Sequence, residues 1–250
     1  MLFITGLSGL NYHALVVLWP LQCQILFGPD PIKISRIISA TGFSLIIGII
    51  VINWLLSRLR GAARELMTLC CAIMTAGTGS MATINQNTPS LAIGLSILTA
   101  FGIGGLLQPT GTILTIVTPD ELLATIIAAS ITVRVVGGTI GYAVYFNILQ
   151  NKLAEVLRGN VIKASLQAGL PPGQLAPFAE ALLSKNSTAL GRFPQNVVDA
   201  AMDAVKDSYV AGFRLIYLVS IAFGVVAIVA SLMLGDIRKH MDDRVAVVIH

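Results

Sequence analysis

Residues 91–117, LAIGLSILTAFGIGGLLQPTGTILTIV, run without a single charged side chain. A helix of this length can cross the hydrocarbon core of a bilayer, which is roughly 30 Å thick and takes about 20 apolar residues. Five further stretches have the same character, namely 2–27, 37–57, 66–84, 122–149 and 209–234. The pattern predicts an all-α integral membrane protein with six transmembrane helices.

Charged residues avoid these six stretches. Of the 16 Lys and Arg and the 12 Asp and Glu residues, only Arg134 and Arg214 lie inside one. The composition agrees, because 11% of the residues are charged, against about 25% in soluble domains. The net charge of +4 is explained by the basic cytoplasmic loops of membrane proteins, so we expect no nucleic-acid partner.

The residue groups that carry enzyme chemistry are missing from the sequence. It contains no Ser/His/Asp set, no paired carboxylates and no phosphate-binding loop. Cys23, Cys70 and Cys71 lie in apolar stretches without the spacing of metal ligands, which favours buried thiols over a redox or metal role. We therefore expect no enzyme activity, catalytic residue, cofactor or metal site.

Basic residues predict the orientation of the helices in the membrane. Arg58, Arg60 and Arg64 lie between the second and third stretches, and the tail after the last stretch adds Arg238, Lys239 and Arg244. Cytoplasmic loops carry such an excess of basic residues. With six spans, both termini are therefore expected in the cytosol. The plasma membrane is the expected location of the protein.

The segment 150–208 between the last two spans is then external. Its pattern predicts three short helices, at 151–168, 175–185 and 195–206. They would form either a lid over a cavity or, as we favour, a solvated loop on the membrane surface. Asn186-Ser187-Thr188 is a sequon for N-glycosylation in this external segment.

Arg134 is the side chain in the spans that most needs an explanation. An arginine at mid-membrane costs at least about 2.5–3.5 kcal/mol and faces a bundle interior or a water-filled path. Gly138, Gly141 and Tyr145 lie within about 40° of it on the same helix face, and Gly137 and Gly141 have the spacing of a helix-packing contact. A role in a solute path and a structural role that pins helices together both stay open.

Two other spans carry polar side chains on one face. Gln108 and Thr112 share a face at Pro109, which weakens the helix by removing a backbone donor, so a contact zone for a ligand is predicted there. Asn11 and Gln22 share a face of the first span, whereas His13 points away and is interpreted as an interhelical hydrogen bonder rather than a proton carrier. The nearly uniform apolar stretch 209–234 is placed on the lipid-facing rim.

Four motifs resemble the C-terminal half of fungal major facilitator superfamily transporters. The similarity is greatest to the fourteen-span drug:proton antiporters, and among these to the trichothecene or toxin efflux pumps. The motifs, which a tail ending DDRVAVV supports, are LWPLQCQILFG (18–28), WLLSRLRGAAREL (54–66), GIGGLLQPTGT (102–112) and VRVVGGTIGYAVYFNIL (133–149).

The resemblance implies that residues 1–250 form a six-helix transporter domain that packs against another half around a central cavity. Such a protein exports drugs or toxins, its partners being small molecules, protons and lipid. The chain departs from the family pattern because it lacks the N-terminal half with its glycine-proline motif. SRLRGAAR also keeps the arginines but not the aspartate of the usual loop motif.

The function expected from the resemblance is efflux of drugs or toxins by proton antiport as part of a longer transporter. The substrate path would include Asn11, Gln22, Gln108, Thr112, Arg134 and Tyr145. Since no Asp or Glu lies within a span, a coupling carboxylate would belong to residues that are not in this chain. The partner in the membrane would be the missing N-terminal half or a second copy. The alternative is a truncated, non-transporting membrane protein that only packs in the bilayer.

Overall fold

The computed structural model describes all residues except 29, 60, 184–190, 192 and 236–250. Among the described residues it contains helices and no strand. Six helical stretches are long and apolar enough to cross a membrane, which confirms the predicted all-α membrane fold. In lipid every backbone N–H and C=O must be bonded internally, and a helix achieves this within one segment.

The first span is interrupted at its middle. Helix α1 (Leu2–His13) is followed by a π-helical turn, η1 (Ala14–Leu18), and by α2 (Trp19–Phe27). Pro20 lies at the start of α2 and has no backbone N–H to give to the preceding turn. The widened turn takes up this missing bond, in the manner of the π-bulges that interrupt α-helices.

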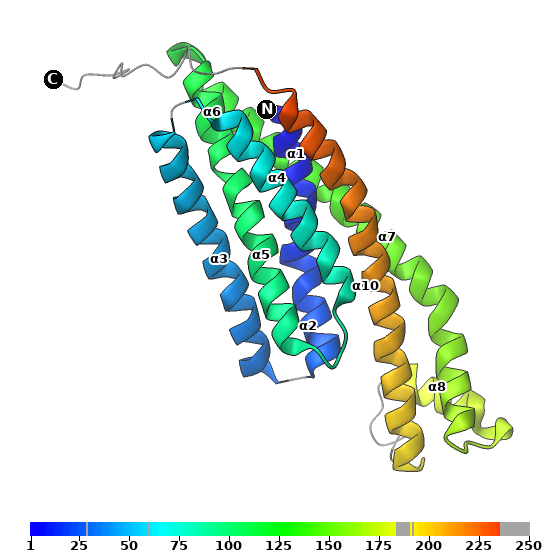
Figure 1. Ribbon diagram of the computed structural model, residues 1–250. Helices are drawn as coiled ribbons and strands as arrows, with labels where there is room; N and C mark the ends of the chain where they lie inside the picture. Colours follow the sequence, from blue (N-terminus) through cyan, green and yellow to red (C-terminus); the bar gives the residue numbers. More distant parts are fainter. Residues whose placement is uncertain (29, 60, 184–190, 192, 236–250) are drawn as a thin grey trace. The chain divides into compact units, whose positions relative to one another are not determined.

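The second and third spans pack on the fourth. Helix α3 (Pro31–Arg58) and α4 (Ala63–Ser80), extended by the 3₁₀ turn η2 (Met81–Thr83), both pack on α5 (Pro89–Leu107). Figure 1 shows α3, α5 and α4 side by side. At Pro109 the fourth span continues as α6 (Pro109–Val117).

The last two long helices extend far beyond the expected spans. After η3 (Asp120–Leu122), α7 runs from Leu123 to Gln167, and α10 runs from Gln195 to Leu232. Between them lie η4 (Pro172–Gln174) and α8 (Leu175–Leu183). The expectation of three separate short helices is therefore wrong for the first and the third, which continue the two spans.

The end of α7 has a local cause. Gly169 adopts a φ of +97°, and the N–H of Leu170 donates to the carbonyl of Ser165 at 3.0 Å, which is the glycine-based motif that ends helices. Pro171 and Pro172 follow it. Upstream there is no proline to break the chain back to Pro119, so one helix covers both the span and the first expected short helix.

The chain divides into two compact units. The bundle unit comprises Met1–Tyr145 and Ile216–His250, and the small unit comprises Phe146–Leu215. The small unit has a hydrophobic core of its own, made by Val161, Leu170, Phe178, Val197, Ala201 and Ala204. Segment 150–208 is thus a folded helical unit in its described part rather than an irregular loop. Its external position stays a prediction.

Glycines set the distance between the helices of the bundle unit. A Cβ on Gly104 of α5 would collide with the backbone carbonyl of Leu45 in α3, and one on Gly102 would collide with the backbone of Met74 in α4. Small residues permit this backbone approach, which drives helix association where lipid is as apolar as the side chains. The core of the unit therefore rests on close backbone contact.

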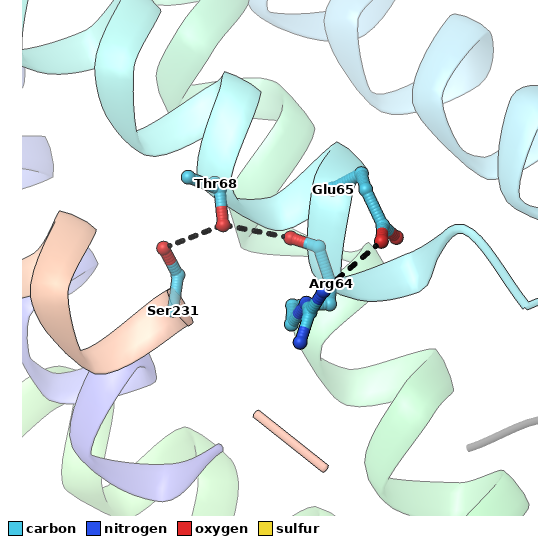
Figure 2. A network of polar contacts seen from close by, with 4 residues as sticks. All are labelled: Arg64, Glu65, Thr68 and Ser231. Atoms are coloured by element: carbon cyan, nitrogen blue, oxygen red, sulfur yellow. Dashed lines mark hydrogen bonds and ion pairs between the residues drawn. The ribbon is translucent and has the colours of Figure 1, made fainter. Parts of the chain in front are cut away.

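Helix α10 has a buried face that the sequence did not indicate. Tyr217 is 2% exposed and Ser231 is fully buried. The Ser231 Oγ lies 3.0 Å from the Thr68 Oγ1 of α4, which in turn donates to the Arg64 carbonyl at 2.8 Å; Figure 2 shows this chain of contacts. The prediction of a rim helix is thus incomplete, because only the opposite face of α10 is exposed.

We expect Gly104→Ala to destabilise the protein by about 1–3 kcal/mol, the cost of overpacking a close contact. Gly94→Ala is the matched control on the same helix, because a Cβ at Gly94 meets nothing within 4 Å. The control should be neutral or slightly stabilising, since alanine is the better helix former. Unfolding in detergent by SDS titration measures both. Equal stability of the two variants would contradict glycine-controlled packing.

Candidate functional site

Arg134 of α7 bonds to the break between α5 and α6. Its Nη2 donates to the carbonyl of Leu107 and lies 3.4 Å from the Thr110 Oγ1. Leu107 is the last residue of α5, and the last four carbonyls of a helix have no partner within it. The arginine therefore supplies the donor that the break leaves missing, which is one of the two roles that the sequence had left open.

Glycines hold Arg134 in place from the side of α1. A Cβ on Gly9 would strike the backbone carbonyl of Arg134 and approach its Cγ to 3.0 Å. Gly137 likewise faces Gly6, and Gly141 faces Leu10. The side chain is half-buried, and its buried Nε has no partner among the described residues. One buried guanidinium donor thus has no acceptor beside a tightly packed helix pair.

Asn11 and Tyr145, both predicted path residues, lie together. The Tyr145 Oη donates to the Asn11 Oδ1 at 3.3 Å, and the two side chains are 0–1% exposed. The Asn11 Nδ2 faces the sulfur of Met74 at 3.8 Å, a weak acceptor. In this structure the pair links α1 to α7 inside the bundle unit.

Gln22 is paired in the same way with a residue that the sequence analysis missed. The Tyr217 Oη of α10 donates to the Gln22 Oε1, and both side chains are buried. The sequence contained a signal for Tyr217, because its hydroxyl lies within an apolar span. The span as a whole is so apolar that it was assigned to the lipid-facing rim, and this hydroxyl was not considered. The amide oxygens of Asn11 and Gln22 thus both accept hydrogen bonds from tyrosines. The predicted role of these two residues in a solute path stays a prediction.

Gln108 and Thr112 lie on the outer side of the α5/α6 break. Gln108 is exposed, and the Thr112 Oγ1 is 3.2 Å from the Asn53 Oδ1 of α3. Asn53 was missed, although an amide within an apolar span is a visible signal. Its Nδ2 donates to the Ile49 carbonyl at 3.1 Å, so Asn53 is held in place and presents its oxygen to Thr112.

The first span presents a different amide from the expected ones. Gln24 is exposed, whereas Gln22 and Asn11 are buried. Gln24 follows Gln22 by two residues, so the two amides lie on opposite sides of the helix. The polar face predicted for this span, with Asn11 and Gln22, is therefore its buried face. The exposed amide of Gln24 was not included in the prediction.

The exposed and half-buried polar groups are suited to binding rather than catalysis. Gln108 and Gln24 supply amides, which donate and accept hydrogen bonds, and Arg134 supplies a guanidinium, which only donates. The predicted glycosylation site, Asn186, lies outside the described residues. What these groups can do is hold a polar part of a solute against an otherwise apolar helix surface.

Comparison with known proteins places these features in one family. The whole chain, residues 1–250, matches the family described as fungal trichothecene efflux pump. It is 26% identical to the trichothecene efflux pump TRI12 of Fusarium sporotrichioides, over 98% of this chain and 42% of that protein. Identity is 29% with the trichothecene efflux pump TRI12 of Trichoderma arundinaceum, again over 98% of this chain and 42% of the relative.

A third relative is the MFS-type transporter prx5 of Penicillium rubens, with 24% identity over 97% of this chain and 45% of that protein. The chain thus spans less than half the length of the curated relatives it matches. These similarities agree with the four motifs that the sequence shares with the major facilitator superfamily.

The bond between Gln22 and Tyr217 makes a testable prediction. A double-mutant cycle of Gln22→Leu and Tyr217→Phe should show a coupling of about 0.6–1.7 kcal/mol, the range of interhelical hydrogen bonds in membranes. A cycle of Asn11→Leu with Tyr217→Phe is the control and should be additive, because Asn11 bonds to Tyr145 instead. Unfolding free energies in detergent give both couplings. Additivity in the first cycle would contradict the pairing.

Proposed function

This chain belongs to the fungal trichothecene efflux pump family, and we propose that it forms half of a transporter that exports small toxic molecules by proton antiport. Its relatives are efflux pumps and transporters of the major facilitator superfamily, so transport is the function of the family. The toxin class, the coupling to protons and the plasma-membrane location with both termini cytosolic are our proposals.

One observation carries the proposal, namely the exposed amide of Gln108 in the middle of the fourth span. A polar group left in hydrocarbon without a partner costs several kcal/mol. Water or protein must therefore cover this face when the chain is in a membrane. A cavity between two transporter halves provides both, and it lets a passing solute bond to the same amide.

Arg134 gives this face its second hydrogen-bonding group. Its Nη2 binds at the Leu107 carbonyl, directly before Gln108, and its Nε has no protein partner among the described residues. An oxygen-rich solute offers acceptors for such a donor. Trichothecenes, for which these relatives are named, are the solutes that we propose for this path.

A second half completes the cavity in this proposal. The second half is either the remainder of a longer transporter or another copy of this chain, since many transporters are built from repeated halves that rock against each other. Helix α7 supports the need for a partner, because only 11% of its most apolar stretch is buried within the chain.

We expect the 250-residue chain by itself to give no resistance to a trichothecene in cells lacking their own efflux pumps. Co-expression with the N-terminal half of a related transporter should lower the accumulation of labelled toxin. Immunoblotting of the membrane fraction controls for expression. Energy-dependent efflux by the purified chain in liposomes would contradict the need for a different N-terminal half. It would support a transporter in which two copies of this chain form the two halves.

In the completed transporter, Arg134→Ala should reduce initial efflux rates at least tenfold, because the guanidinium bond at the α5/α6 break is lost. Arg134→Lys should restore little, since a point charge cannot replace a planar multi-donor group. Gln108→Leu should raise KM more than it lowers kcat. Thr132→Ala is the control on α7, as its hydroxyl bonds only within its own helix. Normal efflux by Arg134→Ala would show that the arginine serves only in helix packing.

A further inference from the structure

His13 lies at the interruption of the first span. It is the last residue of α1, directly before the π-helical turn Ala14–Leu18, and it lies near the middle of the first span, Leu2–Phe27. Interrupted helices near the bilayer midplane are where transporters bind coupling ions, and π-helical turns often mark functional sites. The side chain is half-buried, so it lies in the packed bundle without being sealed off.

The hydrogen bond of His13 differs from the interhelical one expected from the sequence. Its Nδ1 lies 3.1 Å from the carbonyl of Gly9 in the same helix. A carbonyl only accepts, so Nδ1 carries the hydrogen. In a neutral imidazole the other nitrogen, Nε2, then has a free lone pair. The geometry thus assigns Nε2 as the atom that takes up a proton.

Among the described residues, the contacts of the His13 side chain involve no carboxylate. The imidazole occupies the space in front of Gly138 of α7, where a Cβ would collide with the ring, and it meets the Tyr12 ring edge-on at 5.6 Å. Within the bundle unit, α7 contributes Arg134, Tyr142 and Tyr145 as titratable residues, while α5 and α6, which also contact α1, contribute none. Arg134 is the permanent charge that α7 brings to the side of α1 where His13 lies.

His13 is also distinguished by its chemistry within the whole sequence. None of the six apolar stretches contains Asp or Glu, and His13 is the one histidine among them. Imidazole is the side chain whose ordinary pKa, about 6.5, allows it to gain and lose a proton near neutral pH. Intramembrane relays are built from such Asp, Glu and His residues.

We propose that His13 is the proton-binding residue of this half of the transporter, with Nε2 gaining a proton from the acidic side and releasing it on the other. This inference rests on the proton antiport proposed above. His13 bonds to the Gly9 carbonyl, and a Cβ on Gly9 would approach the Arg134 Cγ to 3.0 Å. Gly9 and His13 share a face of α1, so a charged imidazole adds a second positive charge on the side of α1 that packs against Arg134. Like charges repel, and protonation therefore weakens the bond from Arg134 to the α5/α6 break.

The first test uses the completed transporter in proteoliposomes and compares wild type with His13→Gln, which keeps a polar side chain but cannot be protonated. Gradient-driven efflux should fall at least tenfold in the variant, while downhill exchange of labelled for unlabelled toxin should change less than twofold. A merely structural residue would impair both. Equal dependence of the two proteins on the pH gradient would overturn the inference alone, whereas wild-type efflux without gradient dependence would overturn proton antiport as well.

The second test needs only the 250-residue chain in lipid nanodiscs. The ¹³Cε1 resonance of His13, identified by its absence in His13→Gln, should shift when the sample is acidified, because the imidazole gains a proton in this proposal. Tyr12→Phe is the matched control and should keep the titration. A His13 resonance that does not shift between pH 4.5 and 8.5, in a chain whose circular dichroism shows intact helices, would overturn the proposal without touching the transport function.

Discussion

Close contact between helix backbones is the constraint on which the rest of this structure depends. In a bilayer the apolar side chains gain little by leaving lipid, so helices associate through packing at small residues. Gly102 and Gly104 bring α5 against both α4 and α3, and Gly137 brings α7 against α1. The polar contacts between helices of the bundle unit, such as Tyr145–Asn11, depend on these short distances, because an amide or a hydroxyl reaches only a closely packed neighbour.

The polar side chains of the bundle unit divide by their surroundings into two groups. Asn11 and Gln22 are buried and occupied by tyrosines, so they hold helices together in this structure. Gln108 and Gln24 are exposed in membrane spans and need water or another protein surface. Arg134 belongs to both groups, since one nitrogen serves the Leu107 carbonyl while Nε has no protein partner among the described residues. This division supports the proposal that the chain forms one half of a transporter.

Much of the candidate site was accessible to sequence reasoning, and the misses have a common cause. Helical periodicity correctly set Arg134 on one face with Gly138 and Gly141, because angles within one helix follow from residue spacing alone. It did not identify Tyr217 as the partner of Gln22, since these residues are far apart in sequence and nothing in either helix specifies its neighbour. For the same reason periodicity grouped Asn11 with Gln22 but left open which side of the span is buried.

By itself the sequence determined the six membrane-crossing helices, because hydrophobic length and the exclusion of charge are properties of each segment in turn. It also determined the family, through motifs that are local. Only the tertiary structure decided that 146–215 is a folded unit with its own core, that α10 has a buried face, and that His13 bonds to Gly9 rather than across the interface. These features depend on which surfaces meet, and that is settled by packing and hydrogen bonding between segments that are distant along the chain.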